Sequence, residues 1–170
     1  AMTDTMALRK KIDEELKKHP DAHFGYAFVD LHTGERFSHQ GSRSFHSAST
    51  MKTPVMVEAY KQAAAGKFSL DDEVEIYNRF TSIANKKVTY SLNPADDSEK
   101  ELYSMTGRKT SWNDLIYRMI TESSNLATNI LIDKLGAKNI MATLRSVGAD
   151  GVQVLRGVED IPAYEKGMNN

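Results

Sequence analysis

The chain has 170 residues, with 22 basic and 23 acidic side chains and no cysteine, and its formal charge is −1 with the histidines neutral. The length suits one domain or part of a larger protein, and the balanced charge offers no basic surface for nucleic acid or anionic lipid. The absence of cysteine excludes disulfides, thiolate metal sites and cysteine nucleophiles, and no apolar run is long enough to span a bilayer.

The first part of the chain is predicted to form a helix followed by a β-hairpin. Apolar residues recur at helical spacing over 8–16, and 24–31 is rich in aromatic and β-branched residues. A turn at 32–34 lets 35–39 return beside the first strand. Two strands do not form a stable sheet unaided, so the hairpin needs partner strands, which the sequence after Val154 does not supply.

A candidate nucleophile lies where the turn-rich stretch 42–47 gives way to a helical pattern over 51–66. Ser49 and Lys52 are three residues apart and share one helical face. If Lys52 is desolvated enough to lose its proton, it can accept the hydroxyl proton of Ser49 and activate that oxygen for attack on a carbonyl. The same pattern also fits a helix-capping serine beside a surface lysine, so the functional interpretation depends on the other motifs.

The rest of the chain is predicted to be almost wholly helical. A polar stretch over 85–110 is too long for an ordinary connection and is either a functional loop or a mobile one. Helices are predicted over 112–121, 125–135 and 139–147, with glycines ending the last two. The apolar stripe of the first of these three is assigned to the core: Leu115, Ile116, Met119 and Ile120.

A second polar constellation, Ser123-Ser124-Asn125, lies in the short link between two predicted helices. Ser123 could relay a proton between Lys52 and a leaving group, and the amide of Asn125 could bind a substrate carbonyl. The alternative is that these residues simply cap the next helix. Either interpretation leaves the link at a helix start.

We assign no metal and no cofactor. The chain has five histidines, but none forms a pair spaced four residues apart on a helix. All of them lie in predicted turns, the hairpin or helix ends, where solvated histidines are common. They are His19, His23, His32, His39 and His46.

Two segments resemble the motifs of one enzyme family. Residues 45–52, Phe-His-Ser-Ala-Ser-Thr-Met-Lys, resemble the nucleophile segment of class A β-lactamases and related penicillin-recognising serine hydrolases, and 119–129 resembles their Ser-Asp-Asn motif. The resemblance implies an α+β fold of the β-lactamase/transpeptidase type. Residues 1–44 would belong to its α/β domain and 45–170 to its helical domain.

The resemblance also implies roles for individual residues. Ser49 would be the acylated nucleophile, Lys52 its proton acceptor, Ser123 the relay and Asn125 a substrate ligand. Three further positions correspond to supporting elements of the family: Asn129 and Arg156 would support the omega loop, and Tyr90 would form the aromatic wall of the pocket.

The sequence departs from the family pattern at three places. Ser124 replaces the usual aspartate of the second motif, which removes a charge. The glutamate that activates the deacylating water would be Glu159, one residue out of the usual register; the alternative is that Glu159-Asp160 is a solvated acidic loop paired with Arg156. No Lys-Thr-Gly or Lys-Ser-Gly occurs, so the resemblance implies the N-terminal two-thirds of such an enzyme, inactive or nearly so alone.

Three functions follow. The first is a β-lactamase-type hydrolase that opens β-lactam amides through a Ser49 acyl-enzyme. The second is a penicillin-binding D-alanyl peptidase or esterase relative that acylates but deacylates slowly, and the third is a helical fragment or binding module without catalysis. Partners would be a small β-lactam, peptide or ester substrate and, through the incomplete sheet, further copies of the chain. Family members are usually exported, whereas 1–11 is charged where a signal peptide would be apolar.

Overall fold

The computed structural model describes residues 5–170. They form two compact units, residues up to Phe45 and His46–Asn170. No helix within 5–170 has both the length and the apolar character needed to cross a membrane.

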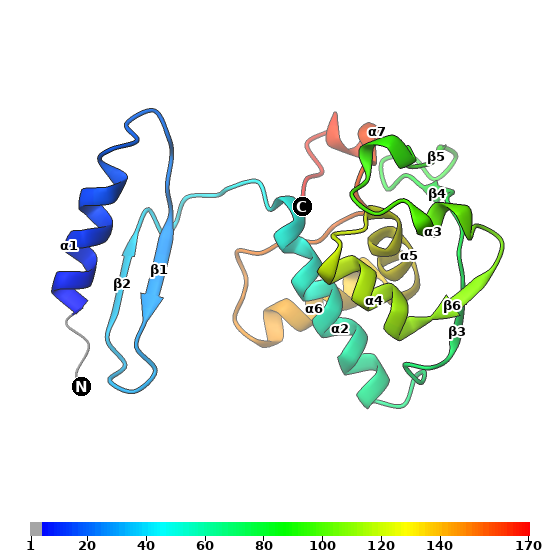
Figure 1. Cartoon of the computed structure of the whole chain (residues 1–170), viewed down its shortest axis with the longest axis horizontal. Coiled ribbons are helices and arrows are strands. Elements are labelled where there is room, and N and C mark those ends of the chain that lie inside the picture. The colour runs from blue at the N-terminus through cyan, green and yellow to red at the C-terminus, as the bar shows by residue number, and fades with distance from the viewer. Residues whose placement is uncertain (1–4) are drawn as a thin grey trace. The chain divides into compact units, whose positions relative to one another are not determined.

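The first unit contains a helix and a two-stranded antiparallel sheet (Figure 1). Helix α1 spans Thr5–Leu16, and strands β1 and β2 span Tyr26–Val29 and Arg36–His39. The half-buried side chains alternate along both strands, and the hydroxyl of Tyr26 donates to a carboxylate oxygen of Asp13 on α1 at 3.2 Å. One face of the hairpin therefore turns toward α1, while the alternate residues of both strands stay exposed.

The second unit is mainly helical, with two further two-stranded antiparallel pairs, β3 with β6 and β4 with β5. Its elements run in chain order: η1 (Ala48–Met51), α2 (Lys52–Ala64), β3 (Glu73–Glu75), β4 (Phe80–Thr81), β5 (Thr89–Tyr90), η2 (Pro94–Asp96), α3 (Glu101–Ser104), β6 (Lys109–Ser111), α4 (Trp112–Thr121), α5 (Asn125–Leu135), α6 (Ala137–Ser146) and α7 (Ile161–Tyr164).

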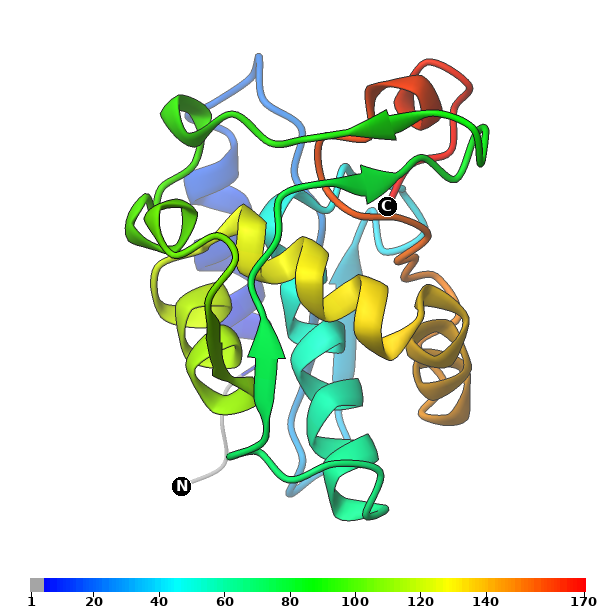
Figure 2. The same cartoon turned by 90° about the vertical axis from the view of Figure 1, so that its right-hand side faces the viewer.

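Helix α5 is the centre of this unit (Figure 2). It contacts α2, α4 and α6, and most of its residues are buried on all sides. A helix that is apolar all round belongs inside a core, whereas α4 buries only one stripe. The largest fully buried side chains near these helices are Met51, Leu115, Met119, Leu126, Ile130, Leu131 and Leu135.

Two expectations about individual elements are wrong. Ile120, assigned to the core stripe of α4, is 40% exposed because successive helix residues are rotated by about 100°, which puts it at the edge of the stripe that contains the fully buried Met119. The third helix begins at Ala137, directly after Gly136, rather than at residue 139, because Gly136 with φ +83° both ends α5 and starts α6.

The polar stretch 85–110 is neither unstructured nor one loop. It contains β5, η2, α3 and the start of β6, and β6 pairs with β3. The side chain of Asn93 accepts from the amide of Ala95 and so starts η2. The buried residues of the stretch are Leu92, Asp97, Glu99 and Leu102, so it packs into the unit instead of covering it loosely.

Candidate active site

Ser49 lies in the short helix η1, which continues directly into α2. The preceding residue, Ala48, has φ +45°, a left-handed conformation that costs a non-glycine residue about 1 kcal/mol or more. Its amide donates to Nδ1 of His46 at 3.2 Å, which helps to hold this turn. The turn leaves Ser49 exposed while Met51 and Lys52, the next residues of the same segment, are buried.

The side chain of Lys52 lies at the meeting point of the predicted site residues. It is only 2% exposed, and its Nζ lies 3.2 Å from Oγ of Ser49, 2.9 Å from Oγ of Ser123 and 2.9 Å from Oδ1 of Asn125. Its shortest contact, 2.6 Å, is to the backbone oxygen of Ser123. The two hydroxyls themselves are 2.9 Å apart, although 74 residues separate them in sequence.

Burial lowers the pKa of Lys52 below its ordinary value, and the nearby negative charge of Asp97 acts in the opposite direction. The effect of burial is the larger of the two. At a given pH, a larger fraction of Lys52 is therefore the neutral amine, which can accept a proton, than of a surface lysine.

The link between α4 and α5 positions Ser123 and Asn125. Ser123 has φ +57°, so the chain turns sharply at this residue and brings both its oxygen atoms to Lys52. Ser124 is fully buried, and its hydroxyl caps α5 by accepting from the amide of Ala127 at 3.2 Å. Capping and the proposed chemistry are thus not alternatives, because neighbouring residues of the link serve each purpose.

The segment before α7 is held to α5 by one side chain. Asn129 donates to the backbone oxygen of Val158 at 3.0 Å and accepts from its amide at 2.7 Å, as a neighbouring strand would. Gly157 permits this approach, since a Cβ there would lie 2.7 Å from Oδ1 of Asn129. Arg156 is 7% exposed and donates to the backbone oxygens of Met168 and Gly157.

The alternative of a solvated acidic loop is wrong for one of its two residues. Asp160 is fully buried and accepts hydrogen bonds from the hydroxyl of Ser82 at 2.6 Å and the amide of Ile83 at 2.9 Å. It also caps α7. Arg156 forms no ion pair with Glu159 or Asp160 among residues 5–170, because its guanidinium is used by backbone oxygens.

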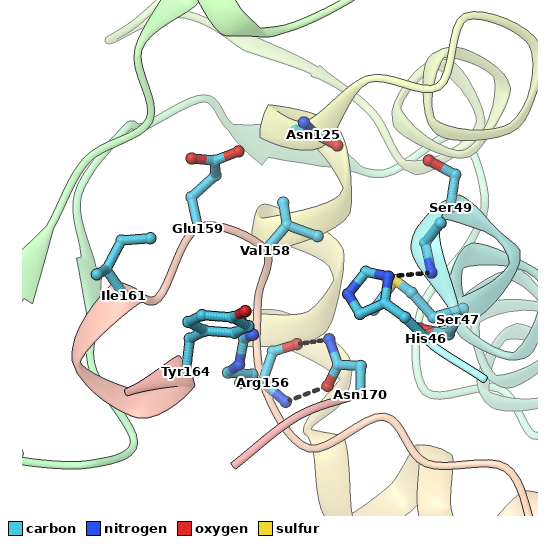
Figure 3. A pocket seen from close by; sticks show the side chains of 12 residues that line it. His46, Ser47, Ser49, Asn125, Arg156, Val158, Glu159, Ile161, Tyr164 and Asn170 are labelled. Carbon is cyan, nitrogen blue, oxygen red and sulfur yellow. Dashed lines mark hydrogen bonds between the residues drawn. The ribbon is translucent and has the colours of Figure 1, made fainter. Parts of the chain in front are cut away.

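Glu159 is exposed and has φ +63°. It lines the same cavity as Ser49 and Asn125, and Figure 3 shows Glu159 and Ser49 at opposite sides of it. Within the described part of the chain, Glu159 makes no hydrogen bond to Ser49, Lys52 or Asn125. The cavity has a volume of about 350 Å³, and Tyr164, Arg156 and Asn170 line it below Val158 in this view.

Tyr90 does not line this cavity. Its hydroxyl accepts from Nδ2 of Asn129 at 3.5 Å, and together with Phe80 and Gly157 it borders a separate hollow. Burial raises the pKa of Tyr90, and the charge of Asp160 adds to this effect. The structure thus brings Ser49, Lys52, Ser123 and Asn125 together, whereas Tyr90 contacts the supporting residue Asn129.

Three residues at or near the site were missed by sequence reasoning. His46 and Asn170 line the cavity, and Asp97 contacts the start of α5 from a segment that precedes it by 28 residues. Of these three, only His46 belongs to a segment that resembles a family motif, residues 45–52. No local pattern points to Asp97, since its partners are backbone amides of another segment. Among the described residues no cluster of potential metal ligands occurs.

Comparison with known proteins agrees with the family that the two sequence segments resemble. A family model described as "Beta-lactamase enzyme family" matches residues 7–170. Beta-lactamase CARB-4 of Pseudomonas aeruginosa is 27% identical over 128 residues, which cover 75% of this chain and 40% of that protein. The chain therefore spans less than half the length of this relative.

Solved structures show the same fold. A β-lactamase from Sphaerobacter thermophilus is 28% identical, with a TM-score of 0.61 over 79% of this chain and 46% of that one. A β-lactamase from Chitinophaga pinensis is 21% identical, with a TM-score of 0.70 over 93% and 54% of the two chains, and at that identity the likeness concerns the fold alone. The predicted α+β fold of the β-lactamase type is confirmed.

Proposed function

Because the chain belongs to the β-lactamase enzyme family, we propose that it carries the acylating groups of a serine hydrolase that opens β-lactam amides. One observation carries the proposal: the buried amine of Lys52 contacts the hydroxyls of both Ser49 and Ser123. A lysine with a lowered pKa in contact with a hydroxyl is an arrangement that activates a nucleophile.

In the proposed reaction the neutral amine of Lys52 takes the proton of Ser49, and Oγ of Ser49 attacks the β-lactam carbonyl carbon. The amide C–N bond then breaks, and the departing nitrogen receives a proton from Lys52 through the hydroxyl of Ser123. An ester on Ser49 results. The amide of Asn125 is placed to bind a side-chain carbonyl of the substrate, as its Oδ1 is already held by Lys52.

The fate of the ester distinguishes two candidate functions. Hydrolysis needs a carboxylate within hydrogen-bond reach of the attacking water. Glu159 lines the cavity from the opposite side and has no contact with Ser49 or Lys52 among residues 5–170, which favours the second candidate, a penicillin-binding peptidase or esterase relative that deacylates slowly. The first candidate, a β-lactamase, requires Glu159 to turn toward Ser49.

The test is covalent labelling with a fluorescent penicillin, followed by intact-protein and peptide mass spectrometry. It uses the 170-residue chain and the same chain continued by a segment that contains Lys-Thr-Gly, since this chain matches only about half of each structural relative. We expect faster labelling of the continued chain, because an added oxyanion donor is worth about a hundredfold or more in rate.

Two variants separate specific from incidental labelling. Ser49→Ala should lose the adduct, whereas Ser47→Ala, in the same cavity wall, should retain it. A stable adduct without turnover supports the slow-deacylating enzyme, and turnover supports the β-lactamase. If the continued chain forms no adduct on Ser49, the proposed acylation is wrong, and the third candidate, a member of the family without catalysis, is supported.

A further inference from the structure

The start of α5 is held by a carboxylate that lies outside the second motif. Both oxygens of Asp97 accept from the amide of Asn125 at 3.0 Å, and one of them also accepts from the amide of Leu126 at 3.1 Å. The hydroxyl of Tyr103 donates to the same carboxylate at 2.7 Å. Asp97 is 5% exposed, so these contacts replace solvent around a buried group.

The cap of α5 is divided between two segments. Ser124 satisfies the amide of Ala127, and Asp97 satisfies the two amides before it. A carboxylate at a helix start is stabilised by the unpaired N–H groups and the positive end of the helix dipole. The position at which the family pattern has aspartate is occupied here by Ser124, which cannot supply that charge.

Asp97 also influences the reacting amine. Its negative charge raises the pKa of Lys52, against the effect of burial. The other charged or titratable side chains that line the cavity are those of His46, Arg156, Glu159 and Tyr164. Tyr103 contacts Asp97 from α3. The carboxylate therefore affects the site in two ways. It holds the backbone of Asn125, and its negative charge acts on the amine of Lys52.

We infer that Asp97 is a positioning residue of the site, and this inference rests on the proposed function. It supplies from the segment between β5 and α3 the carboxylate that the second motif lacks. It binds the backbone N–H of Asn125 and so fixes the residue whose side-chain Oδ1 contacts Lys52. Its charge also balances that of the ammonium form of Lys52. Asp97 does not touch the substrate, and it acts through these two residues.

The test measures the titration of Lys52 directly, on the 170-residue chain labelled with [ε-13C]lysine, with the resonance assigned by Lys52→Met. In Asp97→Asn, Lys52 should titrate at lower pH than in the unaltered chain, because the opposing charge is gone. The amide proton signals of Asn125 and Leu126 should move upfield. Tyr103→Phe removes one contact of the carboxylate but keeps its charge, so its Lys52 titration should stay unaltered.

A double variant tests whether the charge can be moved. Asp97→Asn combined with Ser124→Asp should return the Lys52 titration toward that of the unaltered chain. Identical titrations in Asp97→Asn and the unaltered chain, or equal shifts in Asp97→Asn and Tyr103→Phe, would overturn the inference. If Asp97→Asn does not fold, the double variant decides: a folded protein with restored titration supports the inference, and an unfolded one overturns it.

These readouts do not require catalysis. Missing penicillin labelling would therefore count against the proposed function alone. An unchanged Lys52 titration would count against the role of Asp97 alone.

Discussion

Strained residues concentrate around the candidate site. Of the four non-glycine residues with positive φ in the described chain, Ala48, Ser123 and Glu159 border the cavity or the Lys52 contacts. Each such conformation costs about 1–3 kcal/mol and persists only where surrounding contacts impose it. The conformations of Ala48 and Ser123 bring the hydroxyls of Ser49 and Ser123 close to the amine of Lys52.

The burial of Lys52 predicts a pH-dependent contribution to stability. Its pKa is lowered in the folded chain relative to the ordinary value of 10.5, so the unfolded chain binds more protons between those two values. Relative to Lys52→Met, the unaltered chain should therefore gain stability as pH rises through this window, by at most about 1.4 kcal/mol per pH unit. Urea unfolding of both proteins at several pH values measures the difference, and a constant offset would contradict it.

Gly157 is predicted to be intolerant of a side chain. A Cβ at this position would lie 2.7 Å from Oδ1 of Asn129 and 2.7 Å from the hydroxyl of Tyr90, so Gly157→Ala must displace the contact between Asn129 and Val158. We expect a loss of about 1–3 kcal/mol in the free energy of unfolding. Gly151→Ala is the matched control, because nothing lies within 4 Å of its Cβ, and thermal unfolding of the two should differ clearly.

At the scale of elements, the site is made by helix starts. Ser49 lies in η1, which leads into α2, and Lys52 is the first residue of α2. The beginning of α5 carries Asn125, and α7 begins beside Glu159. Helix starts expose backbone N–H groups that need acceptors. The N-cap side chains Ser124 and Asp160 provide acceptors at α5 and α7, and Asp97 provides a further one at α5 from a distant segment. The caps therefore fix both the helices and the cavity wall.

The buried cap of α7 should be important for stability. Asp160 joins α7 to the segment after β4, since it accepts from Ala163, Ile83 and Ser82. Asp160→Asn places an NH2 group opposite a donor, and we expect a loss of about 1–3 kcal/mol. Asp150→Asn, at an exposed position, should change the free energy of unfolding by less than about 0.5 kcal/mol. Equal effects in denaturant titrations would refute the role of Asp160.

At the scale of the whole molecule, burial is unequal between the two units. The hydrophobic core runs from Met51 to Val154 and lies entirely in the second unit. In the first unit, Thr5 is the one residue of 5–45 that is buried. Since stability follows apolar burial, the two units should differ in local stability.

Hydrogen exchange can measure this difference. We expect amides of β1 and β2 to exchange at least about a hundredfold faster than those of α5, after correction for intrinsic rates. The buried residues of α5 are protected by contacts with α2, α3, α4 and α6, whereas the first unit has only two strands and one helix within its described residues. Comparable protection of the hairpin and α5 would mean that the first unit is stabilised by more than its own contacts.

Self-association through the hairpin stays a prediction. One face of β1 and β2 is exposed, including Val29 at 43%, and the sheet ends at two strands. Such edges pair readily with other copies. We expect the sedimentation coefficient to rise with protein concentration, and a single monomeric species at all concentrations would argue against it.

The amino-acid sequence by itself determined the long helices, the N-terminal hairpin and the motif residues, because these depend on local periodicity and caps. It did not indicate the short strands β3 to β6, and the pairing of β3 with β6 joins distant segments. The stripe of α4, the stop at Gly136 and the spacing of Ser49 and Lys52 can all be found along the chain without knowing its fold. The likeness of two short segments to one family was enough to predict the fold class.

Only the tertiary structure decided which side chains meet. The contact between Ser49 and Ser123 joins positions 74 residues apart, and Asp97 and Asp160 hold backbone amides that carry no sequence signal. The same holds for Glu159, whose distance from Ser49 depends on the path of the loop that Asn129 fixes. Such contacts depend on packing between distant segments, and a local pattern contains no information on that packing.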